Sequence, residues 1–282
     1  MPPLALAGLL GPHTRLIVPA LAAGMMLLEY GFGRVQQRHS HDLGETAATF
    51  AVALGRLATR DIEALLLAIP FGWVYRHRLF DIDLARWWAL PALLFLSELL
   101  YYWEHRASHR IRWMWATHAV HHSPTKLNLT AAIRLGWTGS LSGNFLFLLP
   151  LVWLGFNPVA VVAMLAANLF YQFFIHTELA PSLGPLEWAL NTPSHHQVHH
   201  ASNTGCLDKN YGGILIVFDR MFGSFAATPQ DETLRYGLAG GVPTINPIRI
   251  ALGEWAAMYH DLTRAPDWPS RWRALFAPPA EG

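Results

Sequence analysis

The sequence is poor in charge. Charged residues make up 14% of its 282 positions, whereas hydrophobic residues make up 52%. Soluble domains carry roughly 25% charged residues, so the deficit indicates that much of the surface faces lipid rather than water. The net charge is +1. The chain therefore lacks the global basic field of a nucleic-acid-binding protein, and no nucleic acid is expected among its partners.

Cysteine is almost absent, since Cys206 is the single one. An internal disulfide and a zinc site built from several thiolates are both excluded. The chain also lacks a serine–histidine–acid order, a phosphate-binding loop and a CxxC motif. No basic residue precedes the apolar run at the N-terminus, which argues against a cleaved signal peptide, so we treat the chain as mature.

Apolar stretches long enough to approach a membrane span, which takes roughly 20 residues, recur along the first two thirds of the chain. They are Leu16–Phe32, Trp87–Trp103, Thr138–Leu154 and Pro158–Ile175, with Thr46–Tyr75 as an ambiguous fifth that contains Pro70. The sequence predicts an all-α integral membrane protein with four or five hydrophobic helices, mainly within 14–176. It forms one domain, 1–282, with a histidine-rich cap at 104–126 and 181–225 and a tail at 226–282 that includes an amphipathic helix, Pro247–Thr263.

Histidine is the residue in excess, with fifteen copies, ten of which lie between His105 and His200. If Trp87–Trp103 ends at one membrane face and Pro158–Ile175 returns to it, all ten reach that face. The same face carries six basic residues: Arg106, Arg110, Arg112, Lys126, Lys209 and Arg220. The positive-inside rule makes it cytoplasmic, although Arg76, Arg78 and Arg86 fall on the other face. The excess of Arg over Lys is typical of a GC-rich bacterial genome, which places the protein in a bacterial inner membrane.

The clustered histidines follow helical spacing. His105 and His109 are four apart, and two HxxHH patterns follow. These are His118, His121 and His122, and then His196, His199 and His200. Residues three and four apart share a helix face, whereas neighbours diverge by about 100°, so each adjacent pair can serve two different ions. Eight ligands are too many for one ion, and imidazole suits redox-active iron. His176, on the returning helix, is a candidate ninth ligand.

Three polar side chains are candidates to support the metal ligands. Glu98 lies inside an apolar helix, seven residues before His105 and on the same face. A carboxylate there is costly and usually functional, and it can accept the free N–H of a metal-bound histidine. A helix-packing hydrogen bond is the alternative. Asn203 and Asp208 follow the last histidine cluster closely and are further candidates, whereas Asn210–Gly213 is expected to shape a turn.

These motifs resemble the fatty acid hydroxylase/sterol desaturase superfamily, and within it the alkylglycerol monooxygenase-like branch. The resemblance rests on YYWEHRASH around His105, WATHAVHH around His118, FIHTE around His176 and NTPSHHQVHH ending at His200, followed by DKNYGG and FDRMFG. It implies a cytoplasmic di-iron cap and O2-dependent oxidation of a lipid chain. It also implies that the eight clustered histidines and His176 bind the iron. The family often has an acid directly after the second histidine, where this chain has Arg110.

The chemistry expected of such a site is hydrogen abstraction from an unactivated C–H bond followed by rebound to an alcohol. The substrate is a fatty acyl, alkyl ether or sterol-like lipid from the bilayer. The electron donor is of the ferredoxin, cytochrome or pterin type, and tetrahydrobiopterin is implied only by the resemblance. A desaturase using the same site, a histidine-rich metal transporter and a zinc hydrolase are the alternatives, and zinc can occupy an iron site after purification. The oligomeric state stays open.

Overall fold

The computed structural model describes residues 14–279, and within that range its regular elements are all helices joined by loops, with no β-strand. Its long elements are α2 (Thr14–Val35), α3 (Leu43–Arg76), α4 (Ala89–Arg110), α5 (Arg112–His122), α8 (Pro158–Ile175) and α11 (Pro247–Arg264). Its short α-helices are α6 (Gly139–Ser142), α7 (Leu149–Leu154), α9 (Pro193–His200), α10 (Val217–Phe222) and α12 (Trp268–Phe276). The 3₁₀ turns are η1 (Ala131–Ile133), η2 (Asn144–Phe147), η3 (Gly184–Trp188) and η4 (Thr204–Cys206).

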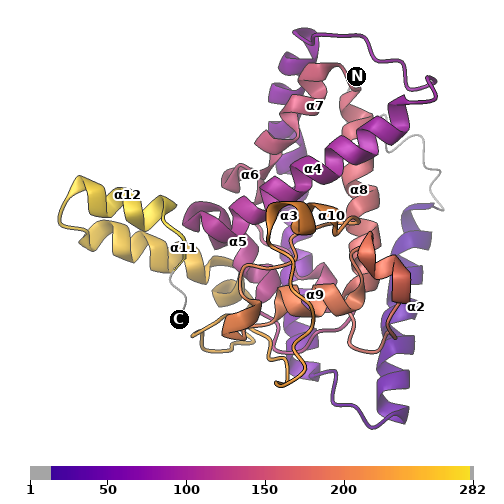
Figure 1. Cartoon of the computed structure of the whole chain (residues 1–282). Coiled ribbons are helices and arrows are strands. Elements are labelled where there is room, and N and C mark those ends of the chain that lie inside the picture. Colours follow the sequence, from indigo (N-terminus) through magenta and orange to yellow (C-terminus); the bar gives the residue numbers. More distant parts are fainter. Residues whose placement is uncertain (1–13, 280–282) are drawn as a thin grey trace.

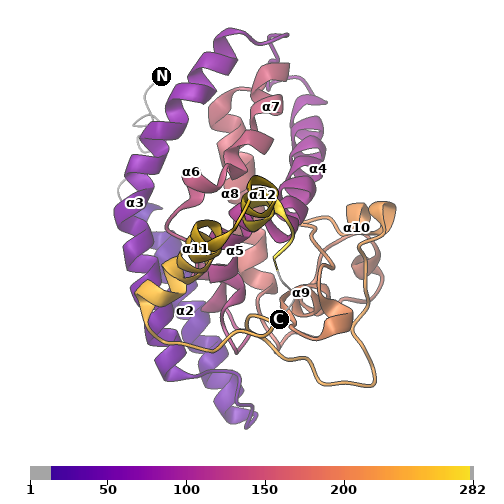
Figure 2. The same ribbon diagram turned by 90° about the vertical axis from the view of Figure 1, so that its left-hand side faces the viewer.

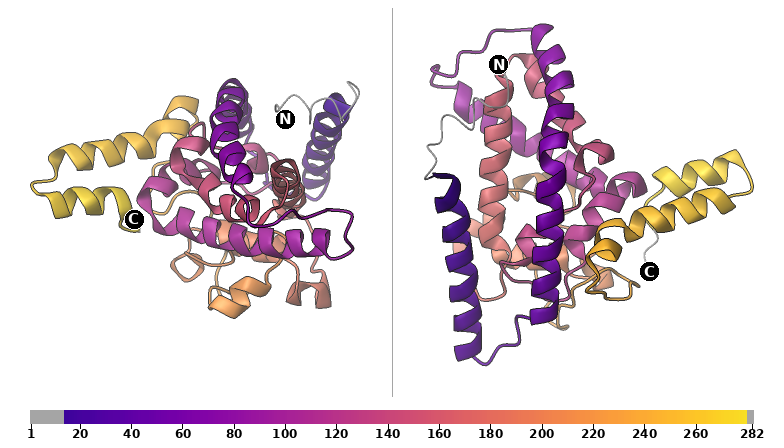
Figure 3. Two further views of the ribbon diagram at one scale, coloured as in Figure 1. Left: turned by 90° about the horizontal axis from the view of Figure 1, so that it is seen from above. Right: turned by 180° about the vertical axis from the view of Figure 1, so that it is seen from behind.

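Three long helices, α2, α3 and α8, run side by side along the long axis of the molecule, and α4 crosses them obliquely (Figure 1). The segments around α9 and α10 form a cap on one side of the lower half (Figure 2). The hairpin of α11 and α12 projects sideways from the body (Figure 3). An apolar cluster that includes Phe71, Leu93, Val152 and Val161 joins α3, α4, α7 and α8. That cluster fixes α4 and α8, two of the elements that carry the clustered histidines.

Local sequence explains where the histidine-bearing helices begin and end. α8 begins at a capping pair, in which the Asn157 side chain accepts the N–H of Val159 and Pro158 takes the first helical position. α9 likewise begins with a proline, Pro193. Between α4 and α5 only Ile111 is extended, with φ −119°. The two helices therefore meet at a one-residue corner.

The structure departs from two boundary predictions. The segment Thr138–Leu154, expected as one apolar helix, is broken into α6, η2 and α7, and this prediction is wrong. Gly143 has φ +87°, a left-handed conformation that ends α6 and that other residues rarely adopt. The helix expected at Trp87–Trp103 instead continues to Arg110, so that His105 and His109 lie within it rather than beyond it. By contrast, the ambiguous region around Pro70 is one continuous helix, α3.

Among the described helices, only α8 is both long enough and apolar enough to count as a membrane span by length and composition. The number of spanning helices therefore remains a prediction.

Candidate metal centre

Four elements bring nine histidines into two adjoining groups. α4, α5 and α9 each contribute, and His176 stands at the C-terminal cap of α8. The first group is His105, His109, His118, His122 and His199. The second group is His121, His176, His196 and His200. Within each group one nitrogen per ring lies within 4.8 Å of all the others, a spacing that can hold a metal ion. These nine are the residues that the sequence singled out.

Helical spacing sorts the rings between the groups. The pairs four apart stay together, since His118 and His122 enter the first group, and His196 and His200 enter the second. The middle histidine of each HxxHH pattern enters the other group, since His121 belongs to the second group and His199 to the first. Adjacent residues on a helix point about 100° apart, which produces this division. Each HxxHH helix therefore links both groups.

Three of the rings donate a hydrogen bond from Nδ1 to a backbone carbonyl, which leaves Nε2 without a proton. The Nδ1 atoms of His105, His176 and His199 lie 2.7, 2.6 and 2.9 Å from the carbonyl oxygens of Tyr211, Gln172 and Lys209, respectively. A carbonyl can only accept, so each Nδ1 carries the proton and each Nε2 keeps its lone pair. Metal-bound histidines generally donate their other N–H in this way.

The bare nitrogens then face one another. The Nε2 atom of His176 is 3.1 Å from that of His121 and 2.9 Å from that of His196. In the first group, Nε2 of His118 is 3.1 Å from that of His105. Two imidazole ligands about 2.1 Å from one ion and at right angles to each other would be about 3.0 Å apart. The buried Nε2 atoms of His109 and His199 have no hydrogen-bond partner. Converging lone pairs and unpartnered nitrogens fit a bound cation.

Burial keeps these imidazoles neutral. Desolvation lowers the pKa of His118 to about 3 and that of His199 to about 4, with neighbouring histidines contributing at His118. Desolvation also places the pKa values of His122 and His200 well below the usual range. A neutral imidazole is the form that binds metal, so the site presents ligand-competent rings at neutral pH.

Glu98 acts on the site through the polypeptide rather than directly. Its carboxylate accepts the backbone N–H groups of Ile214 and Leu215 at 2.7 and 3.0 Å, and the amide of Asn168. Among the described residues no histidine donates to Glu98, and the bond from Asn168 of α8 is the helix-packing hydrogen bond that was the alternative. Glu98 instead anchors the loop whose Tyr211 carbonyl holds His105.

Asn203 and Asp208 have separate surroundings. Asn203 donates to the Glu232 side chain and accepts the N–H of Arg235, so it braces the tail segment that follows the cap. Asp208 lies beside the first group, with Oδ1 3.8 Å from Nδ1 of His109 and Oδ2 accepting from Arg110 at 2.6 Å. The basic residue after the second histidine thus pairs with an acid that arrives from the cap.

The sequence reading missed the residues that shape the loop after α9. Asp219 accepts the N–H groups of Tyr211 and Gly212 at 2.8 and 2.7 Å, and the Asn191 amide donates to the Gly212 carbonyl. Asn210 has φ +56° and bonds to the backbone of Ala226. The segment 210–213, expected as a turn, is an irregular loop that bends at Gly213, and its neighbours hold it beside the histidines. Asp219 lies in the FDRMFG motif noted in the sequence, but no spacing rule predicted its contact with this loop.

His195, the tenth clustered histidine, belongs to neither group. Its ring stacks edge-on against Phe225 at 5.4 Å, and its Nδ1 is 3.4 Å from the Thr192 hydroxyl. It is buried beside His196 without reaching the other rings. His195 therefore provides a matched control for substitutions of its neighbour.

Gly213→Ala is expected to destabilise the fold and loosen the site. A Cβ atom at Gly213 would lie 2.0 Å from Nδ2 of Asn168, the residue that bonds to Glu98. Overpacking of this kind costs about 1–3 kcal/mol. Thermal unfolding should show a lower midpoint for Gly213→Ala, while Gly205→Ala, which meets nothing within 4 Å, should stay near wild type. Equal midpoints for the two variants would contradict the close packing.

A helical protein in which two adjoining groups of buried, neutral imidazoles converge belongs to the class of candidate dinuclear metalloproteins. The fatty acid hydroxylase family matches residues 90–224, a range that contains all nine histidines. Alkylglycerol monooxygenase from Homo sapiens is 38% identical over 251 residues, which are 89% of this chain and 55% of the human protein. The Xenopus tropicalis protein of the same name is 39% identical over 197 residues, 70% of this chain and 42% of that protein.

Ornithine lipid hydroxylase OlsE from Rhizobium tropici is 29% identical over 150 residues, 53% of this chain and 45% of that protein. No solved structure matches the chain. The chain belongs to the fatty acid hydroxylase superfamily and, within it, to the alkylglycerol monooxygenase-like branch. It spans about half the length of the alkylglycerol monooxygenases it matches.

Proposed function

We propose that this chain is a membrane-embedded di-iron oxygenase that uses O2 to hydroxylate an aliphatic C–H bond of a lipid. The observation that carries the proposal is the pair of adjoining all-imidazole groups, linked by His121–His122 and His199–His200. Family relatives named as lipid monooxygenases and hydroxylases support the reaction class. Because those relatives include alkylglycerol monooxygenases, an alkyl ether lipid is the first substrate to test.

The residues of the chain would hold one ion in each group. When bound, an iron pair would supply the redox chemistry that activates O2. The carbonyls of Tyr211, Gln172 and Lys209 orient three of the rings. Burial of the rings excludes water from the centre, which protects a reactive site from side reactions. Metals other than iron also bind imidazole, and zinc in a purified sample would occupy the same nitrogens.

Hydroxylation of a C–H bond by O2 consumes two electrons and two protons, and yields the alcohol and one water. The chain therefore needs an external electron donor, for which we propose a ferredoxin, a cytochrome or a pterin such as tetrahydrobiopterin. If the hydroxylated carbon bears an ether oxygen, the product is a hemiacetal that collapses and cleaves the ether. The oxygen atom then ends in an aldehyde.

The helical body would lie in the bilayer of a bacterial inner membrane, with the histidine end on the cytoplasmic side. α8 is long and apolar enough to span a membrane by length and composition. α3 exposes large apolar side chains along its length, among them Leu54, Leu65 and Ile69, which are 65–69% exposed. A water-facing helix rarely presents such a surface, and lipid contact accounts for it.

The proposal predicts two irons per chain and an oxygenated lipid. Protein purified without O2 would be loaded with Fe(II), analysed for metal, and given O2, a reductant and alkyl ether lipids. A gain of one oxygen, or the aldehyde from ether cleavage, is the expected product in mass spectrometry. Loss of two hydrogens would identify a desaturase instead, and metal uptake into vesicles without any lipid product would identify a transporter. Either outcome would overturn hydroxylation.

A further inference from the structure

The hairpin of α11 and α12 exposes apolar side chains along both of its helices. On α11, Ile248 and Tyr259 are 61% and 67% exposed, and Leu252 lies between them. These three residues are four and seven positions apart, so they share one face of the helix. α12 repeats the pattern with three exposed aromatic residues four positions apart, Trp268, Trp272 and Phe276. Among the described residues nothing covers these two stripes.

Arginines lie on the other exposed surfaces of the hairpin. From Ile248, Arg249 lies about 100° and Arg264 about 160° around α11. α12 carries two more exposed arginines, Arg271 and Arg273. Within the described part of the chain, none of the four forms an ion pair. Aromatic and aliphatic residues on one face and arginines on another are typical of helices that bind at a membrane surface.

Three acidic residues accompany these arginines without cancelling their charge. Asp261 accepts a hydrogen bond from Arg112 of α5 at 2.6 Å, and Asp267 caps the N-terminus of α12. Glu254 lies on the same face of α11 as the buried Ile250, which is turned toward the body. On balance the outer surface of the hairpin is positive, which matches the anionic headgroups of a cytoplasmic leaflet.

The hairpin is fixed to the histidine end of the protein. Ile250 belongs to one buried cluster with Val120 of α5 and Val52 of α3. The Trp255 ring meets that of Trp113 edge-on at 4.9 Å, which joins α11 to the first turn of α5. A surface that binds the hairpin therefore lies beside the helix that carries three of the clustered histidines.

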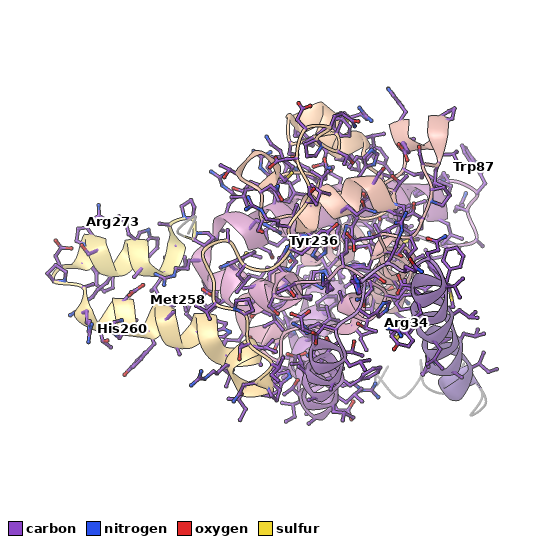
Figure 4. The ribbon with its side chains drawn as sticks, turned by 90° about the horizontal axis from the view of Figure 1, so that it is seen from below. Arg34, Trp87, Tyr236, Met258, His260 and Arg273 are labelled. Atoms are coloured by element: carbon purple, nitrogen blue, oxygen red, sulfur yellow. The ribbon has the colours of Figure 1, made fainter. Side chains whose placement is uncertain are left out.

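The direction of the hairpin fits a membrane surface rather than a span. α11 and α12 project across the direction of α8, which is long and apolar enough to span a membrane (Figures 1 and 3). Seen from below, the two helices extend side by side from the body, with His260 on α11 and Arg273 on α12 (Figure 4). An amphipathic helix at an interface lies in the plane of the membrane, across the spanning helices.

We infer that the α11–α12 hairpin lies in the headgroup region of the leaflet on the histidine side, with its apolar residues among the acyl chains and its arginines on anionic headgroups. The inference rests on the membrane placement in the proposed function and adds a contact with one leaflet. Because α11 packs against α5, which carries His118, His121 and His122, this contact would hold the candidate metal centre at a fixed depth.

Quenching by lipids measures the depth of the hairpin. Because the native Cys206 is buried, an environment-sensitive fluorophore can be attached selectively at Tyr259→Cys in the whole chain. The nanodiscs would contain phosphatidylcholine and phosphatidylglycerol, with a nitroxide near the top of the acyl chains. His260→Cys is the matched control, because its side chain points about 100° away from that of Tyr259. We expect quenching at position 259 to be at least about twofold stronger than at position 260.

Labelled headgroups measure the preference for anionic lipid. Energy transfer from the fluorophore at position 259 to labelled phosphatidylglycerol would be compared with transfer to labelled phosphatidylcholine. Each arginine near an anionic surface contributes about a fivefold preference, so phosphatidylglycerol should be enriched at least about tenfold. Arg264→Gln combined with Arg271→Gln should reduce that enrichment at least about fivefold. Arg86→Gln, an exposed arginine outside the hairpin, should leave it unchanged.

Three outcomes would overturn the inference. Equal quenching at positions 259 and 260 would mean that the apolar face does not enter the bilayer. Shielding of position 259 from water without lipid quenching, in discs that hold two chains, would identify an interface between copies. Equal enrichment of the two lipids would remove the anionic contact.

A third label separates this inference from the proposed function. Leu169 is 44% exposed on α8, so a fluorophore at Leu169→Cys reports whether the body lies in the bilayer. Lipid quenching at position 169 without quenching at position 259 would reject the hairpin contact alone. Quenching at both positions without any oxygenated product would reject the oxygenase alone.

Discussion

Replacing His196 with alanine should reduce the iron content from two ions per chain to about one and lower lipid oxidation at least about 100-fold. His196 belongs to the smaller group, in which its Nε2 is 2.9 Å from that of His176 and 3.1 Å from that of His200. Removing one of four imidazoles leaves three, too few to retain iron firmly without a replacement ligand. Metal analysis after anaerobic loading and product quantification by mass spectrometry measure the two effects.

The adjacent residue supplies the control for this substitution. His195→Ala removes an imidazole that is buried one position away but belongs to neither group, so iron content should stay at the wild-type level. His109→Ala should have a smaller effect than His196→Ala, because four imidazoles remain in its group. Loss of iron from His195→Ala equal to that from His196→Ala, or two irons retained in His196→Ala, would contradict the assignment of ligands to the groups.

The nine histidines could be predicted from sequence because each cluster lies on a helix, where spacing alone decides direction. His121 and His122 diverge into different groups as helical geometry requires. His176 was harder, since it is a single histidine, and only the expected return of the apolar helix before it placed it near the others. Short-range periodicity was therefore enough to predict the candidate ligands, although they come from four separate elements.

The residues that orient the imidazole rings could not be recognised from the sequence in the same way. Tyr211, Gln172 and Lys209 contribute backbone carbonyls, which every residue has, so their side chains cannot reveal the role. Glu98 was found from its cost in an apolar helix, but its partners Ile214 and Leu215 are more than 100 positions away. Contacts that depend on long-range folding are not encoded in local spacing.

Apolar content was also a weak guide to helix continuity. Thr138–Leu154 and Pro158–Ile175 both appear as apolar runs, yet only the second is one helix. Gly139 and Gly143 in the first run mark the difference, and Gly143 adopts the left-handed conformation that ends α6. Hydropathy measures how well a segment tolerates lipid, whereas backbone conformation decides whether the segment stays helical.

The metal-free protein should lose stability sharply on acidification below pH 6.5, while the iron-loaded protein should resist. Burial lowers the pKa of His199 from 6.5 to about 4 and that of His176 to about 4. Between these values the unfolded chain binds protons that the folded chain excludes. The free energy of unfolding therefore falls as pH decreases through this window, by up to about 1.4 kcal/mol per pH unit for each such histidine.

Above pH 6.5 both folded and unfolded chains carry these histidines neutral, so the effect disappears there. Bound iron requires neutral rings and stabilises only the folded state, which shifts the loss of stability to lower pH, where protons displace the metal. Thermal unfolding of both forms at several pH values between 8 and 5 measures the difference. His199→Ala should flatten the pH dependence of the metal-free protein by about one proton, whereas His260→Gln, at an exposed position, should not. A metal-free protein as stable at pH 5 as at pH 7 would mean that water reaches the rings, and the buried, converging site would be wrong.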